Sequence, residues 1–196
     1  MGSPIINLYS QPPIDKNEVF RYAMCNGTDK TINQLLDECI REAALAFNFR
    51  VSYKILPCST SDDIIDLTFE KTHSKGLAKA LAGCEHYIVF AATVGVAVDR
   101  LIKKYSRTAP SKALLFQALG TERIECLCDL FSKEIAKELN IKVKKRVSPG
   151  YGDIPLELQP KIFEVLECPI RLGLVLNDSL LMTPTKSVTA FIGVKK

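Results

Sequence analysis

Hydrophobic positions in the first quarter of the chain follow helical spacing. Residues 16–24 predict a short helix, and apolar residues between 32 and 43 recur at the i, i+3, i+4 and i+7 positions of a longer one. Thr31 and Gln34 resemble a capping box at the start of that second helix. The preceding fifteen residues contain three prolines and predict an extended arm.

The remaining pattern mixes strands and helices without regular alternation. Residues 49–56 alternate at period two, as a half-buried strand does, and residues 86–92 are almost continuously apolar. Shorter strands are predicted over 64–69, 141–147 and 187–194. Helices are predicted over 73–81, 96–105, 109–139 with a break near Gly120, and 158–167.

This order favours an α+β fold over a doubly wound α/β fold, because βα units do not repeat. We expect a central, mostly antiparallel, twisted sheet flanked by helices. Residues 1–47 are expected to form an N-terminal arm and helices that pack on a main domain of residues 48–196. The two parts are expected to form one compact unit.

Composition limits the class of protein. The chain has 196 residues, of which 47% are apolar, and this is enough for a substantial core. A net charge of +4, from dispersed basic residues, does not favour nucleic-acid binding. Neither a membrane-spanning run nor a secretory signal is visible, and the seven cysteines are an odd number. We therefore expect a soluble, cytoplasmic protein with reduced thiols.

The sequence offers little support for a metal site or a catalytic triad. Cys126 and Cys128 lie two apart in a predicted helix, so their side chains point about 200° away from each other. His73 and His86 have no metal ligands at suitable spacing. Gly95 follows a strand, but one glycine is not a dinucleotide-binding motif. No residue is assigned a catalytic role.

The segment from 146 to 155 has the chemistry of a binding loop. Arg146 provides a charged fork, Pro149 fixes its own φ, and Gly150 can adopt a φ that other residues avoid. Tyr151 adds an aromatic face. Such a loop suits a small zwitterionic ligand with an aromatic group. By periodicity alone, Glu125 belongs to a solvated polar stripe of the predicted helix, together with Glu122, Asp129 and Ser132.

The same loop, the helix 160–166 and the segment 176–190 occur in an order and spacing that resemble a known family. Together they closely resemble the reactivation domain of cobalamin-dependent methionine synthase, which binds S-adenosylmethionine. Two upstream segments, 86–95 and 118–135, support the resemblance. The resemblance implies the fold of that activation domain.

The resemblance also implies a set of ligand contacts. Arg146 would pair with the methionyl carboxylate, and Glu125 would receive the ammonium group. The backbone at Ser148, held by Pro149 and Gly150, would contact the adenosyl group. Tyr151 would contact the adenosyl or sulfonium end of the ligand.

The implied function is reductive methylation of an inactive cobalamin. In the family, cob(II)alamin receives one electron, commonly from a flavodoxin-like reductase, and then a methyl group from S-adenosylmethionine. This chain is too short to hold the cobalamin-binding module, so we expect it to act in trans on a cobalamin-binding methionine synthase core protein, in methionine biosynthesis. The alternatives are a non-catalytic docking or chaperone module and an activity on another corrinoid methyltransferase.

The chain departs from the family pattern in several places. Val147 replaces the usual proline, and Thr183 stands where some members have tryptophan. Asp15 is a weak counterpart of an N-terminal aspartate of the family. The family domain continues past its final strand with a segment that supplies tyrosine contacts. We therefore expect either a low ligand affinity or a site that a partner completes.

Overall fold

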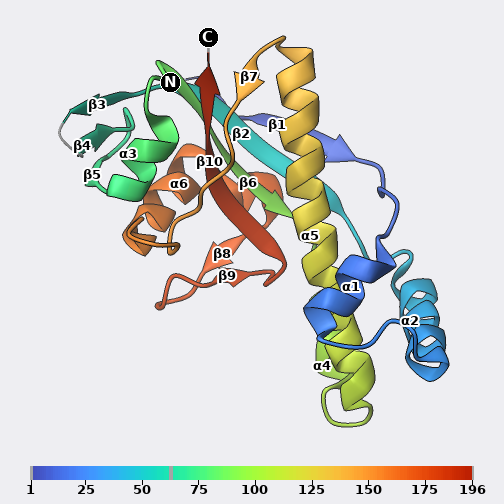
Figure 1. The fold of residues 1–196 in the computed structure, drawn as a ribbon. Coiled ribbons are helices and arrows are strands. Elements are labelled where there is room, and N and C mark those ends of the chain that lie inside the picture. Colours follow the sequence, from blue (N-terminus) through green and yellow to red (C-terminus); the bar gives the residue numbers. More distant parts are fainter. Residues whose placement is uncertain (1, 62–63, 196) are drawn as a thin grey trace.

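A computed structural model describes residues 2–61 and 64–195 of the chain, and a five-stranded antiparallel sheet lies at its centre (Figure 1). The strand order is β1-β2-β6-β10-β7. These strands are β1 (Ile5–Tyr9), β2 (Phe49–Pro57), β6 (His86–Thr93), β7 (Lys142–Val143) and β10 (Ser187–Lys195). The predicted α+β class and antiparallel sheet are confirmed.

The central strands are buried on both faces of the sheet. In β2, the consecutive residues Val51, Ser52 and Tyr53 are at most 4% exposed. The prediction of a half-buried strand was therefore wrong for β2. Successive side chains of β2 point to opposite faces of the sheet, and both faces are covered by helices.

One face of the sheet is covered by the long helix α5 (Pro110–Glu138), with α4 (Ala97–Tyr105) beside it (Figure 1). The predicted break near Gly120 was wrong, because α5 continues through it. Gly120 instead allows a close approach. A Cβ at this position would lie 3.0 Å from Cγ of Lys186, whose side chain crosses the helix here.

The other face of the sheet is covered by shorter helices. They are α3 (Lys75–Leu81), the 3-10 turn η1 (Leu156–Leu158), α6 (Gln159–Val165) and α7 (Cys168–Leu172). Two small sheets lie nearby: β3 (Ser59–Ser61) with β4 (Ile64–Asp66) and β5 (Lys71–His73), and β8 (Val175–Leu176) with β9 (Met182–Thr183). The sequence pattern had predicted only β4 among these small strands.

The N-terminal residues add to both the sheet and the helical layer. The expected extended arm includes β1, which pairs antiparallel with β2. Helices α1 (Lys16–Ala23) and α2 (Lys30–Ala43) then pack on α5. The predicted capping box was wrong, because Asp29 caps α2 by accepting hydrogen bonds from the amides of Thr31 and Ile32.

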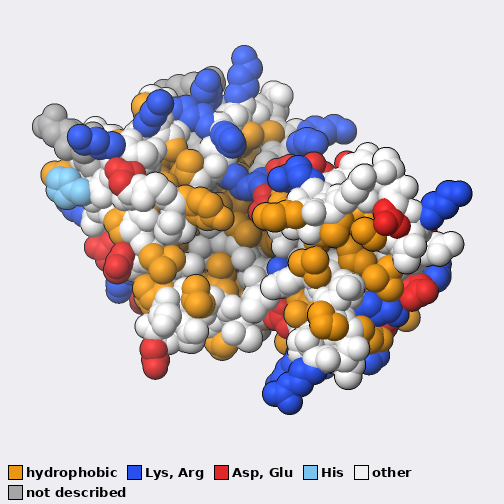
Figure 2. All heavy atoms as spheres, turned by 60° about the horizontal axis from the view of Figure 1, so that its bottom comes forward, with side chains coloured by type: hydrophobic (Ala, Val, Ile, Leu, Met, Phe, Trp, Pro, Cys, Tyr) orange, Lys and Arg blue, Asp and Glu red, His pale blue; other side chains and the backbone are white. Residues whose placement is uncertain are grey.

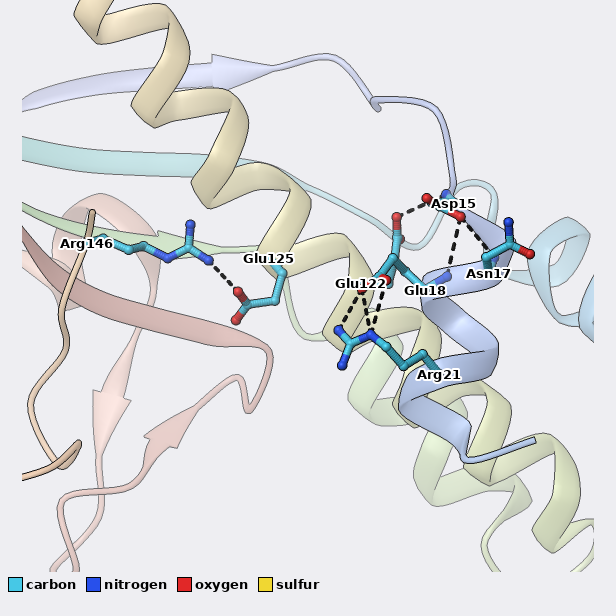
Figure 3. A network of polar contacts seen from close by, with 7 residues as sticks. All are labelled: Asp15, Asn17, Glu18, Arg21, Glu122, Glu125 and Arg146. Carbon is cyan, nitrogen blue, oxygen red and sulfur yellow. Dashed lines mark hydrogen bonds and ion pairs between the residues drawn. The ribbon is translucent and has the colours of Figure 1, made fainter. Parts of the chain in front are cut away.

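A buried ion pair on α5 attaches this N-terminal region. Arg123, which is fully buried, pairs with its neighbour Glu122 and donates hydrogen bonds to the carbonyl oxygens of Pro12 and Pro13. Glu122 also accepts a hydrogen bond from the amide of Asp15 at 3.1 Å, at the start of α1 (Figure 3). The predicted solvated stripe was therefore wrong for Glu122.

The two cysteines on α5 differ in their environment, as their spacing predicts. Cys128 is fully buried under the sheet, and Cys126 is partly exposed on another side of the helix. Burial raises the pKa of Cys128 to about 12. Within residues 2–61 and 64–195, no helix is long and apolar enough to cross a membrane.

Candidate functional site

The loop from Arg146 to Pro155 is bound at its start to the middle of β10. Val147 and Phe191 of β10 exchange two backbone hydrogen bonds, at 3.0 and 2.8 Å. Gly150 has a φ of +84°, and its amide donates to the carbonyl of Ile154 at 2.9 Å. The predicted conformational role of Gly150 is confirmed. A side chain here would face both an unfavourable φ and a contact with Leu156.

Asp153 fixes the far end of the loop against α3. Its carboxylate accepts hydrogen bonds from the Ser74 hydroxyl at 2.9 Å, the Lys75 amide at 2.6 Å and the Gly76 amide at 3.0 Å. The Ser74 hydroxyl and these amides lower the pKa of Asp153, since they stabilise the ionised form. The loop is therefore held at both ends.

A pocket of about 560 Å³ lies between this loop, α5 and β10. Its lining includes Glu125, Arg146, Ser148, Tyr151 and Val188. The molecular face in Figure 2 is hollowed between two lobes, with hydrophobic side chains along the margins. The pocket volume falls within the range of about 300–1,000 Å³ that is usual for small-molecule sites.

Arg146, at the wall of the pocket, is the centre of an ion cluster. One terminal nitrogen of its guanidinium group binds Glu125, and the other binds Asp129 (Figure 3 shows the Glu125 contact). Both carboxylates come from α5, where residues four apart lie on the same face. The side chain of Arg146 is 21% exposed, compared with 41% for Glu125 and 62% for Asp129.

The structure brings Glu125, Arg146, Ser148 and Tyr151 to one pocket. Pro149 and Gly150 shape the loop and are not among the lining residues. Pro149 is buried, whereas Tyr151 is 75% exposed at the pocket wall. The ring of Tyr151 is therefore open to solvent.

Sequence reasoning missed two residues that organise this site. Asp129 was grouped with the solvated stripe, although its position four residues after Glu125 places both on the side of α5 that meets the loop. Asp153 was noted as part of the loop without a role. No local pattern reveals its partners, which lie almost eighty positions earlier in the chain.

A second, acidic pocket of about 350 Å³ adjoins the first across α5. Glu125 lines both pockets, and Asp129 lines only the acidic one. Asp15 and Glu18 of the α1 region form the opposite wall. The side chain of Asp15 caps α1, accepting from the amide of Asn17 at 2.9 Å (Figure 3).

No metal centre is formed by the described side chains. In residues 2–61 and 64–195, no group of three or more His, Cys, Asp or Glu side chains could hold a metal ion. The arrangement around Arg146 offers a cation, a carboxylate, a polar backbone and an aromatic face. These groups can bind and orient a zwitterionic ligand.

Comparison with known proteins identifies the fold. No family model matches the sequence, and no curated protein has significant sequence similarity to it. A crystal structure of the MetH reactivation domain bound to AdoHcy superposes with a TM-score of 0.76, covering 97% of this chain and 78% of that one. This chain has the methionine synthase reactivation fold.

The resemblance to the reactivation domain predicted from the sequence is thereby confirmed at the level of the fold. Sequence identity between the two chains is only 19%. The α+β architecture, with an antiparallel sheet between helices, is shared with that reactivation domain. The solved domain holds AdoHcy, the product left when S-adenosylmethionine gives up its methyl group.

Proposed function

We propose that this protein binds S-adenosylmethionine and supports the reductive methylation of cob(II)alamin carried by a separate cobalamin-dependent methionine synthase. One observation carries the proposal. Glu125, Arg146, Ser148 and Tyr151 surround a single pocket in a fold whose solved relative is bound to AdoHcy. These residues are the ones that the family resemblance assigns to the ligand.

The chemistry of the pocket suits the methionyl part of the ligand. A guanidinium group binds a carboxylate with two parallel hydrogen bonds, which is the role proposed for Arg146. Glu125 offers a carboxylate for the ligand ammonium group. Because both side chains line the same pocket, one amino-acid moiety can meet both charges.

The adenosyl part is proposed to lie along the loop. Ser148 presents backbone between the bridge at Val147 and the turn at Gly150. Tyr151 is exposed and can place its ring against the sulfonium or the adenosyl group of the ligand. Asp153 holds this part of the loop in position through α3.

The protein's own contribution is binding and orientation. The ligand supplies the methyl group, and the cobalamin of the partner is the acceptor. Residues of this chain hold the donor so that its methyl group is accessible, which reduces the entropic part of the barrier. The proposed partners are therefore a cobalamin-binding methionine synthase core protein and a flavodoxin-like electron donor, in the cytoplasm.

The test is a reconstituted methylation. The partner core protein with cob(II)alamin is mixed with this protein, S-adenosylmethionine and a reducing system, and formation of methylcobalamin is followed by its absorption spectrum. Wild type and Lys142→Ala, an exposed position outside the pocket, are expected to support methylation, whereas Arg146→Ala is expected to reduce it strongly. Equal rates with and without the protein would refute the proposal.

A non-catalytic docking module is the second candidate. Its support is the ion cluster, in which Glu125 and Asp129 already occupy both terminal nitrogens of Arg146. For such a module, affinity for the corrinoid partner would not change with S-adenosylmethionine or with Arg146→Ala. Methylation that depends on Arg146 would exclude it.

A further inference from the structure

The ion cluster at Arg146 contains one carboxylate for which the proposed ligand has no use. We infer that Asp129 is a specificity-determining residue that competes with the ligand carboxylate for Arg146. The inference rests on the proposed function and extends it to a residue outside the ligand pocket. If Asp129 competes in this way, the native site binds carboxylate-bearing ligands more weakly than a site without the Asp129 charge would.

Both terminal nitrogens of the Arg146 guanidinium group are already bound by carboxylates. Glu125 and Asp129 bind different terminal nitrogens of Arg146, so together they occupy its terminal edge. A ligand carboxylate that binds this edge with two hydrogen bonds must displace both. Without ligand, the terminal edge of Arg146 is therefore occupied by carboxylates of the protein itself.

The two carboxylates differ in the pockets that they line. Glu125 lines the ligand pocket as well as the acidic pocket, and Asp129 lines the acidic pocket alone. When Glu125 leaves Arg146, the ammonium group of the ligand replaces the lost cation. Asp129 lies outside the ligand pocket, so the ligand ammonium group does not replace the cation that Asp129 loses, and its displacement lowers the net affinity.

Displacing Asp129 from Arg146 costs little free energy. The side chain of Asp129 is 62% exposed, and water already solvates much of its charge. Exposed ion pairs contribute little, so the loss of this contact should change affinity by about two- to fivefold rather than by orders of magnitude. Asp129 thus tunes binding without blocking it.

Two related ligands differ in the carboxylate that would compete with Asp129. S-Adenosylhomocysteine has the amino-acid carboxylate, and 5′-methylthioadenosine shares its adenosyl and thioether groups without that carboxylate. Only the first must displace Asp129 from Arg146. Removal of the Asp129 charge should therefore favour S-adenosylhomocysteine selectively.

The test is calorimetric titration of the full chain with both ligands. Asp129→Asn and Asp129→Ala are expected to bind S-adenosylhomocysteine about two- to fivefold more tightly than wild type, with 5′-methylthioadenosine unchanged. Glu18→Gln is the matched control, because Glu18 lines the same acidic pocket but pairs with Arg21. Its affinity for both ligands should equal that of wild type.

Each other outcome overturns the inference. Unchanged or weaker binding of S-adenosylhomocysteine by both Asp129 variants shows that there is no competition. An equal gain for 5′-methylthioadenosine, or in Glu18→Gln, shows a general effect of acidic charge. In both of these outcomes, the proposed ligand site would still stand if Arg146→Ala abolishes binding. If neither wild type nor the variants bind S-adenosylhomocysteine, even with the corrinoid partner present, the proposed function fails with the inference.

Discussion

The carboxylate of Asp153 lies directly against the backbone of Gly76, with an oxygen 3.0 Å from the amide nitrogen. A Cβ at position 76 would stand 2.6 Å from the same oxygen. A side chain at position 76 would therefore have to displace the Asp153 carboxylate from its hydrogen bonds. This contact couples the N-terminus of α3 to one wall of the candidate ligand pocket.

Gly76→Ala is expected to destabilise the protein by about 1–2 kcal/mol, since overpacking outweighs the gain in helix propensity. Chemical denaturation measures this change in the free energy of unfolding. Lys75→Ala is the control, because it preserves the backbone amide that binds Asp153. Equal stability of Gly76→Ala and wild type would mean that the loop does not hold this position in solution.

The lowered pKa of Asp153 gives a pH dependence with a definite sign. Its contribution to stability is fully present above the unfolded pKa of 3.8 and disappears as the pH falls through the lower, folded value. The difference in melting temperature between wild type and Asp153→Asn should therefore shrink as the pH falls below about 4. Asp178→Asn, at an exposed position in the β8–β9 hairpin, is the control for the loss of one carboxylate. A difference that is constant from pH 6 to 3 would contradict the assignment.

Arg123→Met is expected to destabilise the protein by about 3–5 kcal/mol, because it leaves the buried Glu122 without its counter-charge. Urea denaturation measures this loss, and adding Glu122→Gln to the same chain should recover part of it. Arg21→Met removes an exposed ion pair and should cost at most about 1 kcal/mol. Similar losses in Arg123→Met and Arg21→Met would show that the N-terminal region is not anchored by the buried pair.

Three thiols are expected to resist alkylation in the folded protein. Burial raises the pKa of Cys39 to about 11 and those of Cys128 and Cys168 to about 12, so the reactive thiolate is scarce at pH 8. Iodoacetamide followed by peptide mass mapping should modify these positions only after denaturation. Rapid modification of Cys128 under native conditions would contradict its place beneath the sheet.

Much of the fold follows from hydrophobic periodicity. The apolar stretch at 86–92 becomes the central strand β6. The apolar residues at helical spacing from Ile124 to Ile135 become the buried face of α5. Local patterns failed where tertiary contacts decide the structure. Gly120 did not break α5, and it leaves the space that the side chain of Lys186, just before β10, occupies. Strand β1 was missed because its pairing with β2 is not encoded within its own five residues.

The candidate site was predictable only in part. The composition of the segment 146–155 predicted a binding loop, but periodicity placed Glu125 on a solvated face of its helix. Its contact with Arg146 spans twenty-one positions, and only the family resemblance suggested that the two meet at one ligand. Asp129 shares the same face of α5, yet nothing in the sequence distinguishes a carboxylate that pairs with a loop arginine from one that is solvated.

Calorimetric titration with S-adenosylhomocysteine tests the central claim most directly. Wild type is expected to bind one equivalent, Arg146→Lys more weakly because the fork is lost, and Arg146→Ala at least about tenfold more weakly, as expected when a charged hydrogen bond is removed. Lys142→Ala should match wild type. Binding that is equally tight in wild type and Arg146→Ala would contradict the account, as would the absence of binding by wild type even with the corrinoid partner present.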